Sequence, residues 1–240
     1  MTWQTGWHVA TVVGARPLTD TARELTLAVP GFGGTLPGQH VDVRLTAPDG
    51  YQATRAYSLA TAGVDERVDL VVDEVPDGEV SPYLTHDARP GDQVEVRGPL
   101  GGYFVWHDDD PAPVLLVAGG SGVVPFLAML RARRLSGRRA PFRLVCSVRG
   151  PAGAIGRDEI DSPDPGLDVR WVYTREVPPG WPTPPARLTP DDLSAPGFGP
   201  DDGTNVFVCG PTRFVEAAAE LLTGLGHPSA RVRTERFGGA

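Results

Sequence analysis

Residues 55–60, RAYSLA, hold three side chains that could bind a ligand within four positions. In an extended strand alternate side chains point to opposite faces, so Arg55 and Tyr57 share one face and Ser58 lies on the other. An arginine fork matches phosphate oxygens, and a tyrosine ring can lie flat against a planar heterocycle. The segment therefore suits a ligand that carries both a phosphate and a ring.

Two glycine turns add further positions where an anion could bind. Residues 77–84, DGEVSPYL, offer a turn, a serine and amides that could begin a helix. GGSG at 119–122 follows the apolar strand VLLVA and precedes a helical pattern, so its amides and the helix N-terminus would face one concavity. The third glycine of G-x-G-x-x-G is absent from this turn, and a simple strand-to-helix connection is the alternative.

Three more candidate residues lie near the C-terminus. Cys209 ends the apolar segment VFVC, where α/β proteins bind ligands, although a small buried hydrophobe is the usual role of a free cysteine. No His–Asp pair accompanies it, which disfavours a thiol nucleophile. In the tail RTERFGGA, Glu235 and Phe237 would share a face if the tail is a strand. The alternative is an edge strand with Phe237 in the core.

The elements that must position these residues differ between the two halves of the chain. From Trp7 to about Trp106, six short alternating segments separated by Gly, Pro and Asp predict an antiparallel β-barrel or a sandwich, with one helical turn at 80–88. After Pro113, strands alternate with helices, and the first strand is apolar throughout. This pattern predicts a doubly wound parallel α/β domain. The expected domains are residues 1–108 and 109–240. The expected strands of the second domain are 114–118, 142–149, 167–176 and 205–210.

Composition excludes several classes of protein. A net charge of −8 argues against nucleic acid as a partner, and the sequence has neither an 18-residue apolar run nor a signal peptide. Two cysteines make neither a disulfide framework nor a zinc set, and no histidine has metal-binding spacing, so we expect no metal and a cytoplasmic location. Residues 131–139, rich in arginine, are expected to be a solvated helix face, or else a docking site for an acidic electron acceptor. Residues 178–203 are expected to be a surface excursion.

Taken in order, these motifs resemble the ferredoxin–NADP reductase superfamily over nearly the whole chain. RAYS resembles the family's R-x-Y-S flavin signature, GEVSPYL its second flavin-phosphate motif, and residues 89–104 its barrel-closing segment. GGSGVVPFLAML and CGPTRFVEAAAELL resemble the two nicotinamide-nucleotide motifs, and TERF resembles the C-terminal Glu-x-aromatic ending.

The resemblance implies an enzyme, an FAD-containing NAD(P)H reductase, and assigns roles to its residues. Arg55 would bind the flavin pyrophosphate, Tyr57 would pack on the isoalloxazine, and Ser58 would bond near flavin N5. Cys209 would border the nicotinamide, and Glu235 would complete the polar set with Ser58. The other positions carried over for FAD are Ala56, Gly78, Val80, Ser81 and Phe237, and those for NAD(P) are Gly120, Ser121, Gly122, Gly210 and Pro211.

The nucleotide preference and the electron acceptor follow from what the chain lacks. Residues 142–149 end without the acidic residue that would bind a ribose 2′-hydroxyl, whereas Ser147 and Arg149 could meet a 2′-phosphate, which favours NADPH over NADH. Two lone cysteines cannot hold the [2Fe–2S] cluster that many relatives carry, so the acceptor would be a separate ferredoxin or oxygenase component. A monomer is one option for the oligomeric state. The alternative functions are a ferric-siderophore or free-flavin reductase and a non-catalytic flavin-binding sensor or electron-transfer subunit.

Overall fold

The computed structural model describes residues 6–137 and 140–238. Contacts divide the chain into two compact units. The first ends at Trp106 and also takes in Leu127–Ala132, and the second contains His107–Phe126 and resumes at Arg133.

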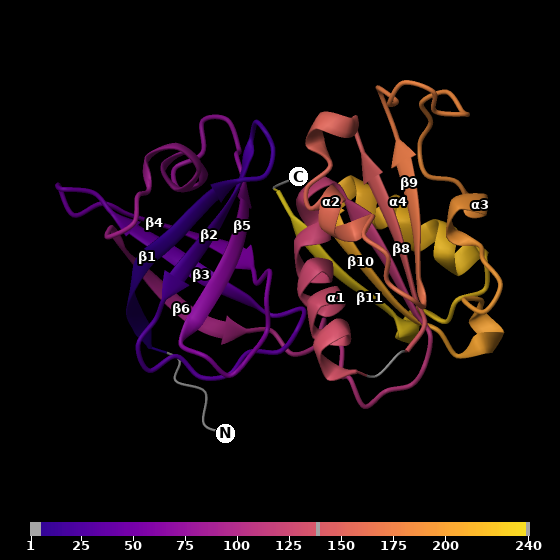
Figure 1. Cartoon of the computed structure of the whole chain (residues 1–240), viewed down its shortest axis with the longest axis horizontal. Helices are drawn as coiled ribbons and strands as arrows, with labels where there is room; N and C mark the ends of the chain where they lie inside the picture. The colour runs from indigo at the N-terminus through magenta and orange to yellow at the C-terminus, as the bar shows by residue number, and fades with distance from the viewer. Residues whose placement is uncertain (1–5, 138–139, 239–240) are drawn as a thin grey trace. The chain divides into compact units, whose positions relative to one another are not determined.

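The first unit is a six-stranded antiparallel sheet with the strand order β4-β3-β6-β1-β2-β5 (Figure 1). An isolated antiparallel bridge between Leu59, just after β4, and Leu70 of β5 joins the two outermost strands, so the sheet closes on itself. Alternating Val and Leu side chains fill the interior, as the predicted barrel requires. The strands are β1 (Trp7–Pro17), β2 (Ala22–Ala28), β3 (His40–Thr46), β4 (Gln52–Ser58), β5 (Arg67–Asp73) and β6 (Gln93–Leu100), and the helical turn is η1 (Tyr83–Asp87).

The second unit is a five-stranded parallel sheet with the order β11-β10-β7-β8-β9. The chain runs from β7 outward to β9 on one side, then returns to place β10 on the other side of β7. The strands are β7 (Val114–Gly119), β8 (Phe142–Val148), β9 (Leu167–Tyr173), β10 (Asn205–Pro211) and β11 (Val232–Phe237). The helices are η2 (Gly120–Val123), α1 (Val124–Ser136), η3 (Pro151–Gly153), α2 (Arg157–Ile160), α3 (Pro190–Leu193), η4 (Pro200–Asp202), α4 (Thr212–Gly224) and η5 (Ser229–Arg231).

Both faces of this sheet are covered, which explains why its central strands are apolar throughout. Leu115 and Val117 of β7 pack in one cluster with Val215, Ala218 and Leu222 of α4. Figure 1 shows α1 in front of the sheet and α4 behind it. The doubly wound architecture predicted from the sequence is confirmed.

Three predictions about local structure are wrong in part. Strand β4 begins at Gln52 and ends at Ser58, so the last two residues of RAYSLA lie beyond it. In the sequence, Leu135 continues the helical spacing of the apolar residues Phe126, Leu127 and Leu130, which predicts that it faces the core with them; in α1 it is 83% exposed. The excursion at 178–203 is mostly exposed, but the short helix α3 within it buries Leu193 against α4.

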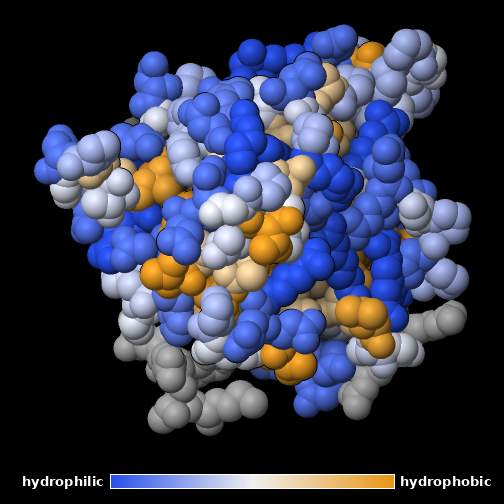
Figure 2. Space-filling model, turned by 60° about the vertical axis from the view of Figure 1, so that its left-hand side comes forward, coloured by the Kyte–Doolittle hydropathy of each residue, from blue (hydrophilic) through white to orange (hydrophobic). Residues whose placement is uncertain are grey.

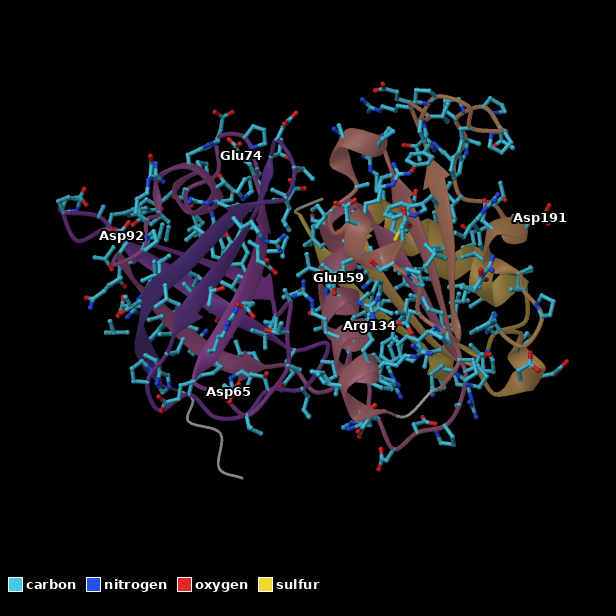
Figure 3. All side chains as sticks on the ribbon, in the orientation of Figure 1. Asp65, Glu74, Asp92, Arg134, Glu159 and Asp191 are labelled. Atoms are coloured by element: carbon cyan, nitrogen blue, oxygen red, sulfur yellow. The ribbon has the colours of Figure 1, made fainter. Side chains whose placement is uncertain are left out.

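The arginines of α1 are not a solvated face. Arg133 is 3% exposed and bonds to Asp164 at 2.7 Å and to the carbonyl oxygen of Ala140 at 2.9 Å. Arg134 points toward Glu159 of α2 (Figure 3), with 3.2 Å between Nη1 and Oε1, and also pairs with Asp164. Ion pairs inside the second unit therefore engage Arg133 and Arg134, whereas Arg131 pairs with Glu24 of β2, and Arg138 and Arg139 lie outside the described residues.

The surface carries apolar residues only in small groups on the face that Figure 2 presents, scattered among hydrophilic ones. None of the helices formed by the described residues has the length and apolar character needed to cross a membrane.

Candidate functional site

Arg55 and Tyr57 lie on the same face of β4, as the alternation predicted. Ala53 and Leu59, which share this parity, are buried in the barrel core, and Tyr57 packs against that core. The Arg55 side chain leaves the core and is 52% exposed. Its Nη1 donates to the carbonyl oxygen of Thr54 at 2.8 Å, and its Nη2 forms an ion pair with Glu79.

Tyr57 is a neutral, partly buried ring beside a cation. Burial raises the pKa of Tyr57 to about 12, and the charge of Arg55 opposes this rise. The phenol therefore stays protonated at any physiological pH. Ala56 is exposed, and Ser58, half-buried, ends the strand opposite His40 of β3. This end of β4 thus presents a ring, a small residue and a hydroxyl in sequence.

The loop between β5 and η1 is held by internal hydrogen bonds. The amide of Val75 donates to Oγ of Ser81 at 3.0 Å, and the amide of Gly78 donates to the carbonyl oxygen of Val75 at 2.9 Å. A Cβ added at Gly78 would lie 2.8 Å from that same oxygen, so only glycine fits this turn. Val80 and Ser81 are buried behind it.

A cavity of about 540 Å³ lies beside this loop, within the first unit. That volume falls in the range of sites for small organic ligands. Its polar groups include Glu79 and Tyr51 and the ion pair of Arg44 with Glu95 (2.8 Å and 2.6 Å). The full lining is Val9, Arg44, Leu45, Thr46, Ala47, Tyr51, Ala53, Glu79, Tyr83, Gln93, Val94 and Glu95.

These features fit a flavin nucleotide. A half-exposed guanidinium, a turn that excludes any side chain at Gly78, a partly exposed neutral ring and an adjoining cavity are the groups that a pyrophosphate and a ring system require. Among the described residues, no group of three or more His, Cys, Asp or Glu is placed to hold a metal ion.

In the second unit, the glycine turn lies at the switch point of the parallel sheet. Strands β7 and β10 are neighbours, with Ala118 opposite Cys209. The chain continues from β7 to β8 on one side of this pair and from β10 to β11 on the other side. Ligands of such sheets bind at this point, beyond the carboxyl ends of the strands. Gly120 has a φ of +54°, and a Cβ there would meet nothing within 4 Å, so the turn is open above it.

Close packing joins the GGSG turn to the end of β10 and to the start of α4. A Cβ at Gly122 would lie 2.1 Å from the carbonyl oxygen of Cys209, which makes glycine obligatory where the turn crosses the end of β10. A Cβ at Gly119 or Gly210 would lie 2.5 Å or 2.7 Å from the ring of Phe214, on the first turn of α4. The Phe214 ring therefore fills the space beneath both turns.

Cys209 and Glu235 are neighbours in the ladder between β10 and β11, and Phe237 lies opposite Pro211. The Cys209 side chain is 1% exposed, and burial raises the pKa of its thiol, as does the nearby charge of Glu235. The thiol is thus neutral at physiological pH. Phe237 is 38% exposed, so it is not a core residue.

Ser147 and Arg149 lie at the carboxyl end of β8. Ser147 pairs with Gly119 across the β7–β8 ladder and is largely buried. Arg149 is exposed, and its carbonyl oxygen accepts the amides of Arg175 and Glu176, each at 2.9 Å. The backbone after β9 is therefore pinned beside Arg149.

The sequence did not indicate Glu79, Tyr51 or Phe214 as parts of these sites. Glu79 lies inside a motif that was recognised for its glycine and serine, and nothing in the sequence pairs it with Arg55. In the sequence, Phe214 is one of several apolar residues that share a helix face, with Ala218, Leu221, Leu222 and Leu225. The signal that could have indicated its role beneath the two turns is a bulky aromatic residue placed four positions after Gly210.

Two family models match this chain in order: the oxidoreductase FAD-binding domain over residues 13–105 and the oxidoreductase NAD-binding domain over residues 116–220. Together they cover most of both units. The first match contains β4 and the Gly78 turn, and the second contains the glycine turn and Cys209.

Similar proteins agree with these models. Ferredoxin–NADP reductase B of Sorangium cellulosum is 35% identical over 95% of this chain and 96% of its own length. The electron transfer component of toluate 1,2-dioxygenase from Pseudomonas putida is 27% identical over 98% of this chain and 69% of its own length. The crystal structure of a cytochrome P450 reductase from Amycolatopsis superposes with a TM-score of 0.83 at 27% identity, over 99% of this chain and 71% of that one. The chain belongs to the ferredoxin–NADP reductase superfamily of FAD- and NAD(P)-binding oxidoreductases.

Proposed function

We propose that this protein is an FAD-dependent NAD(P)H reductase that delivers electrons to a separate acceptor protein. The observation that carries the proposal is that one chain contains both kinds of site. The barrel has Arg55 and the Gly78 turn, and the parallel sheet has a glycine turn at its switch point. When bound, FAD supplies the redox chemistry: it accepts a hydride from NAD(P)H and can release the electrons singly.

The barrel domain, residues 1–108, would hold the flavin. Arg55 and the amides of Val80 and Ser81 would bind the pyrophosphate, because a guanidinium fork and convergent amides both match phosphate oxygens. Gly78, whose own amide is bonded to the carbonyl oxygen of Val75, would contribute by letting the phosphate approach the backbone closely. Tyr57 would cover one face of the ring system beside Ala56, and Ser58 would donate a hydrogen bond to it. The adjoining cavity would take the adenosine end.

The α/β domain, residues 109–240, would hold the nicotinamide nucleotide. Gly120, Ser121 and Gly122 would bind its pyrophosphate at the start of η2, while Gly210 and Pro211 would border its path. Cys209 would lie against the nicotinamide as a small neutral group, because burial raises the pKa of its thiol and so disfavours the thiolate. Glu235 would add a polar contact, and Phe237 would cover the flavin face that the nicotinamide must reach.

NADPH is the preferred donor in this proposal, because Arg149 is exposed at the end of β8 and no carboxylate ends that strand. We expect Arg149→Ala to raise KM for NADPH about tenfold or more, as befits the loss of a charge-assisted phosphate contact, with KM for NADH within about twofold. Arg187→Ala, which changes another exposed arginine of the same domain, is the matched control. An equal effect of Arg149→Ala on both nucleotides would contradict this assignment.

The acceptor is proposed to be a separate one-electron protein such as a ferredoxin or an oxygenase component, and the reductase to be a cytoplasmic monomer. The choice of acceptor rests on relatives named as a ferredoxin reductase and as a dioxygenase electron transfer component. The cytoplasmic location rests on the two lone cysteines, which suit a reducing compartment.

Steady-state NADPH oxidation tests the proposal. FAD-loaded enzyme is assayed with a [2Fe–2S] ferredoxin, a ferric chelate, or free FMN as acceptor. Fast turnover that requires ferredoxin is expected. Turnover only with the ferric chelate or with FMN would identify the alternative reductases, and no turnover with any acceptor would favour a flavin-binding sensor.

A further inference from the structure

Glu79 projects from a rigid part of the flavin-binding loop. The residues on either side of it, Gly78 and Val80, are fixed by the tight turn and by burial, as described above. Asp77 adopts a left-handed conformation with φ of 60°, which turns the chain just before Gly78. The Glu79 side chain itself remains 42% exposed. The loop thus holds its backbone in place while the carboxylate faces β4.

Both oxygens of this carboxylate are occupied by side chains from β4 and the preceding hairpin. Oε2 accepts Nη2 of Arg55, and Oε1 accepts the hydroxyl of Tyr51. Tyr51 is positioned in turn by its amide, which donates to Oδ1 of Asp49 at 3.0 Å. The hydrogen bond from Tyr51 and the interaction with Arg55 hold the pKa of Glu79 below its usual value, so the group is a carboxylate at neutral pH.

The same guanidinium cannot serve two anions equally well. A pyrophosphate at Arg55 would need the donor that Glu79 now takes, and it would add negative charge beside the Glu79 carboxylate. We propose that Glu79 is a built-in competitor of the flavin pyrophosphate for Arg55, so that it lowers the affinity for FAD and speeds FAD exchange. This inference rests on the proposed function, in which Arg55 binds that pyrophosphate.

If Glu79 competes with the pyrophosphate, removing its charge should raise the affinity for FAD. Removing a residue that contacts FAD favourably would lower that affinity. Glu79→Gln keeps the shape of the side chain but removes its charge. Both the ion pair with Arg55 and the repulsion of the pyrophosphate are then lost. We expect FAD to bind about fivefold more tightly, a size typical of half-exposed ion pairs, and mainly through slower release.

The test is the dissociation constant of FAD, measured by flavin fluorescence on the deflavinated full chain. The variants are Glu79→Gln, Arg55→Ala and the double variant. Glu74→Gln is the matched control, because Glu74 (labelled in Figure 3) is another paired carboxylate of the same unit, 2.9 Å from His86. Tighter binding in Glu79→Gln, lost in the Arg55→Ala background and absent from Glu74→Gln, is the expected result.

Failures of the inference and of the proposed function give different results. If Glu79→Gln binds FAD with unchanged or weaker affinity while Arg55→Ala weakens binding, the competition is refuted and the flavin site stands. If Glu79→Gln tightens binding equally without Arg55, the effect does not act through that residue and the inference fails. If the unaltered chain binds no FAD, or Arg55→Ala binds as well as it does, the proposed flavin site itself is wrong.

Discussion

Cys209 is a buried, neutral thiol at the end of β10, and this state can be measured. Thiol reagents attack the thiolate, and burial raises the pKa of both Cys209 and Cys146. We expect neither cysteine to react appreciably with Ellman's reagent at pH 8 in the folded protein. Both should react in guanidinium chloride, since the chain has two cysteines.

The variant Cys146→Ala assigns any reactive thiol. Rapid labelling of this folded variant would show that Cys209 is accessible and ionised. The neutral role proposed for Cys209 beside the nicotinamide would then be wrong.

His227, just beyond α4, links stability to pH. It is 4% exposed, and burial lowers the pKa of its imidazole. The folded protein therefore keeps this ring neutral at pH values where the unfolded chain binds a proton. The resulting stability is complete above the unfolded pKa of about 6.5 and is lost as pH falls toward the lower folded pKa.

Urea titrations between pH 7.5 and 5.5 check this linkage. The free energy of unfolding should decline toward pH 5.5. In His227→Gln the slope of this decline should be smaller, because up to about one proton fewer is taken up on unfolding. An identical pH slope in the two proteins would mean that His227 titrates alike in both states.

Single residues also show where sequence reasoning stops. Arg55 and Tyr57 could be predicted from alternation in one strand, because neighbours two positions apart must share a face. The partner of Arg55, Glu79, lies 24 positions away in a loop whose path depends on the Gly78 turn and the Ser81 hydroxyl. Tertiary structure alone brings those two charges together.

The GGSG turn packs so closely against the end of β10 that only glycine fits at position 122. A Cβ at Gly122 would collide with backbone atoms of Cys209 and Gly210, which no side-chain rotation relieves. Gly122→Ala should therefore displace the turn, cost about 1–3 kcal/mol in the free energy of unfolding, and weaken NADPH binding about tenfold or more.

Gly153→Ala serves as the control, since a Cβ there would meet nothing within 4 Å. Its stability should change by less than about 0.5 kcal/mol. Nucleotide titration and thermal melting of the two variants give the comparison. Unaltered nucleotide binding in Gly122→Ala would place the pyrophosphate away from this turn.

Elements were predictable where one physical rule dominates. Continuous apolar strands such as β7 require cover on both faces, and this requirement led to the parallel sheet. Helix α1 was less predictable, because Leu135 follows the apolar spacing but projects beyond the packed surface, while Arg133 is drawn inward by Asp164. The ion pair between Arg133 and Asp164 therefore decides which face of α1 is buried at this end, and the apolar spacing does not.

The two domains of the molecule provide different parts of the binding machinery. One domain offers a cation, a ring and a cavity, and the other offers a glycine turn at a sheet switch point. The protein's contribution is to bind FAD and NAD(P)H.

Anaerobic titration of the FAD-loaded protein with NADPH, followed by the flavin absorbance near 450 nm, measures the transfer of the hydride from NADPH to the flavin. The absorbance should be bleached fully by about one NADPH per flavin, as expected for a two-electron transfer. If neither NADPH nor NADH bleaches the yellow protein, it is not an NAD(P)H reductase.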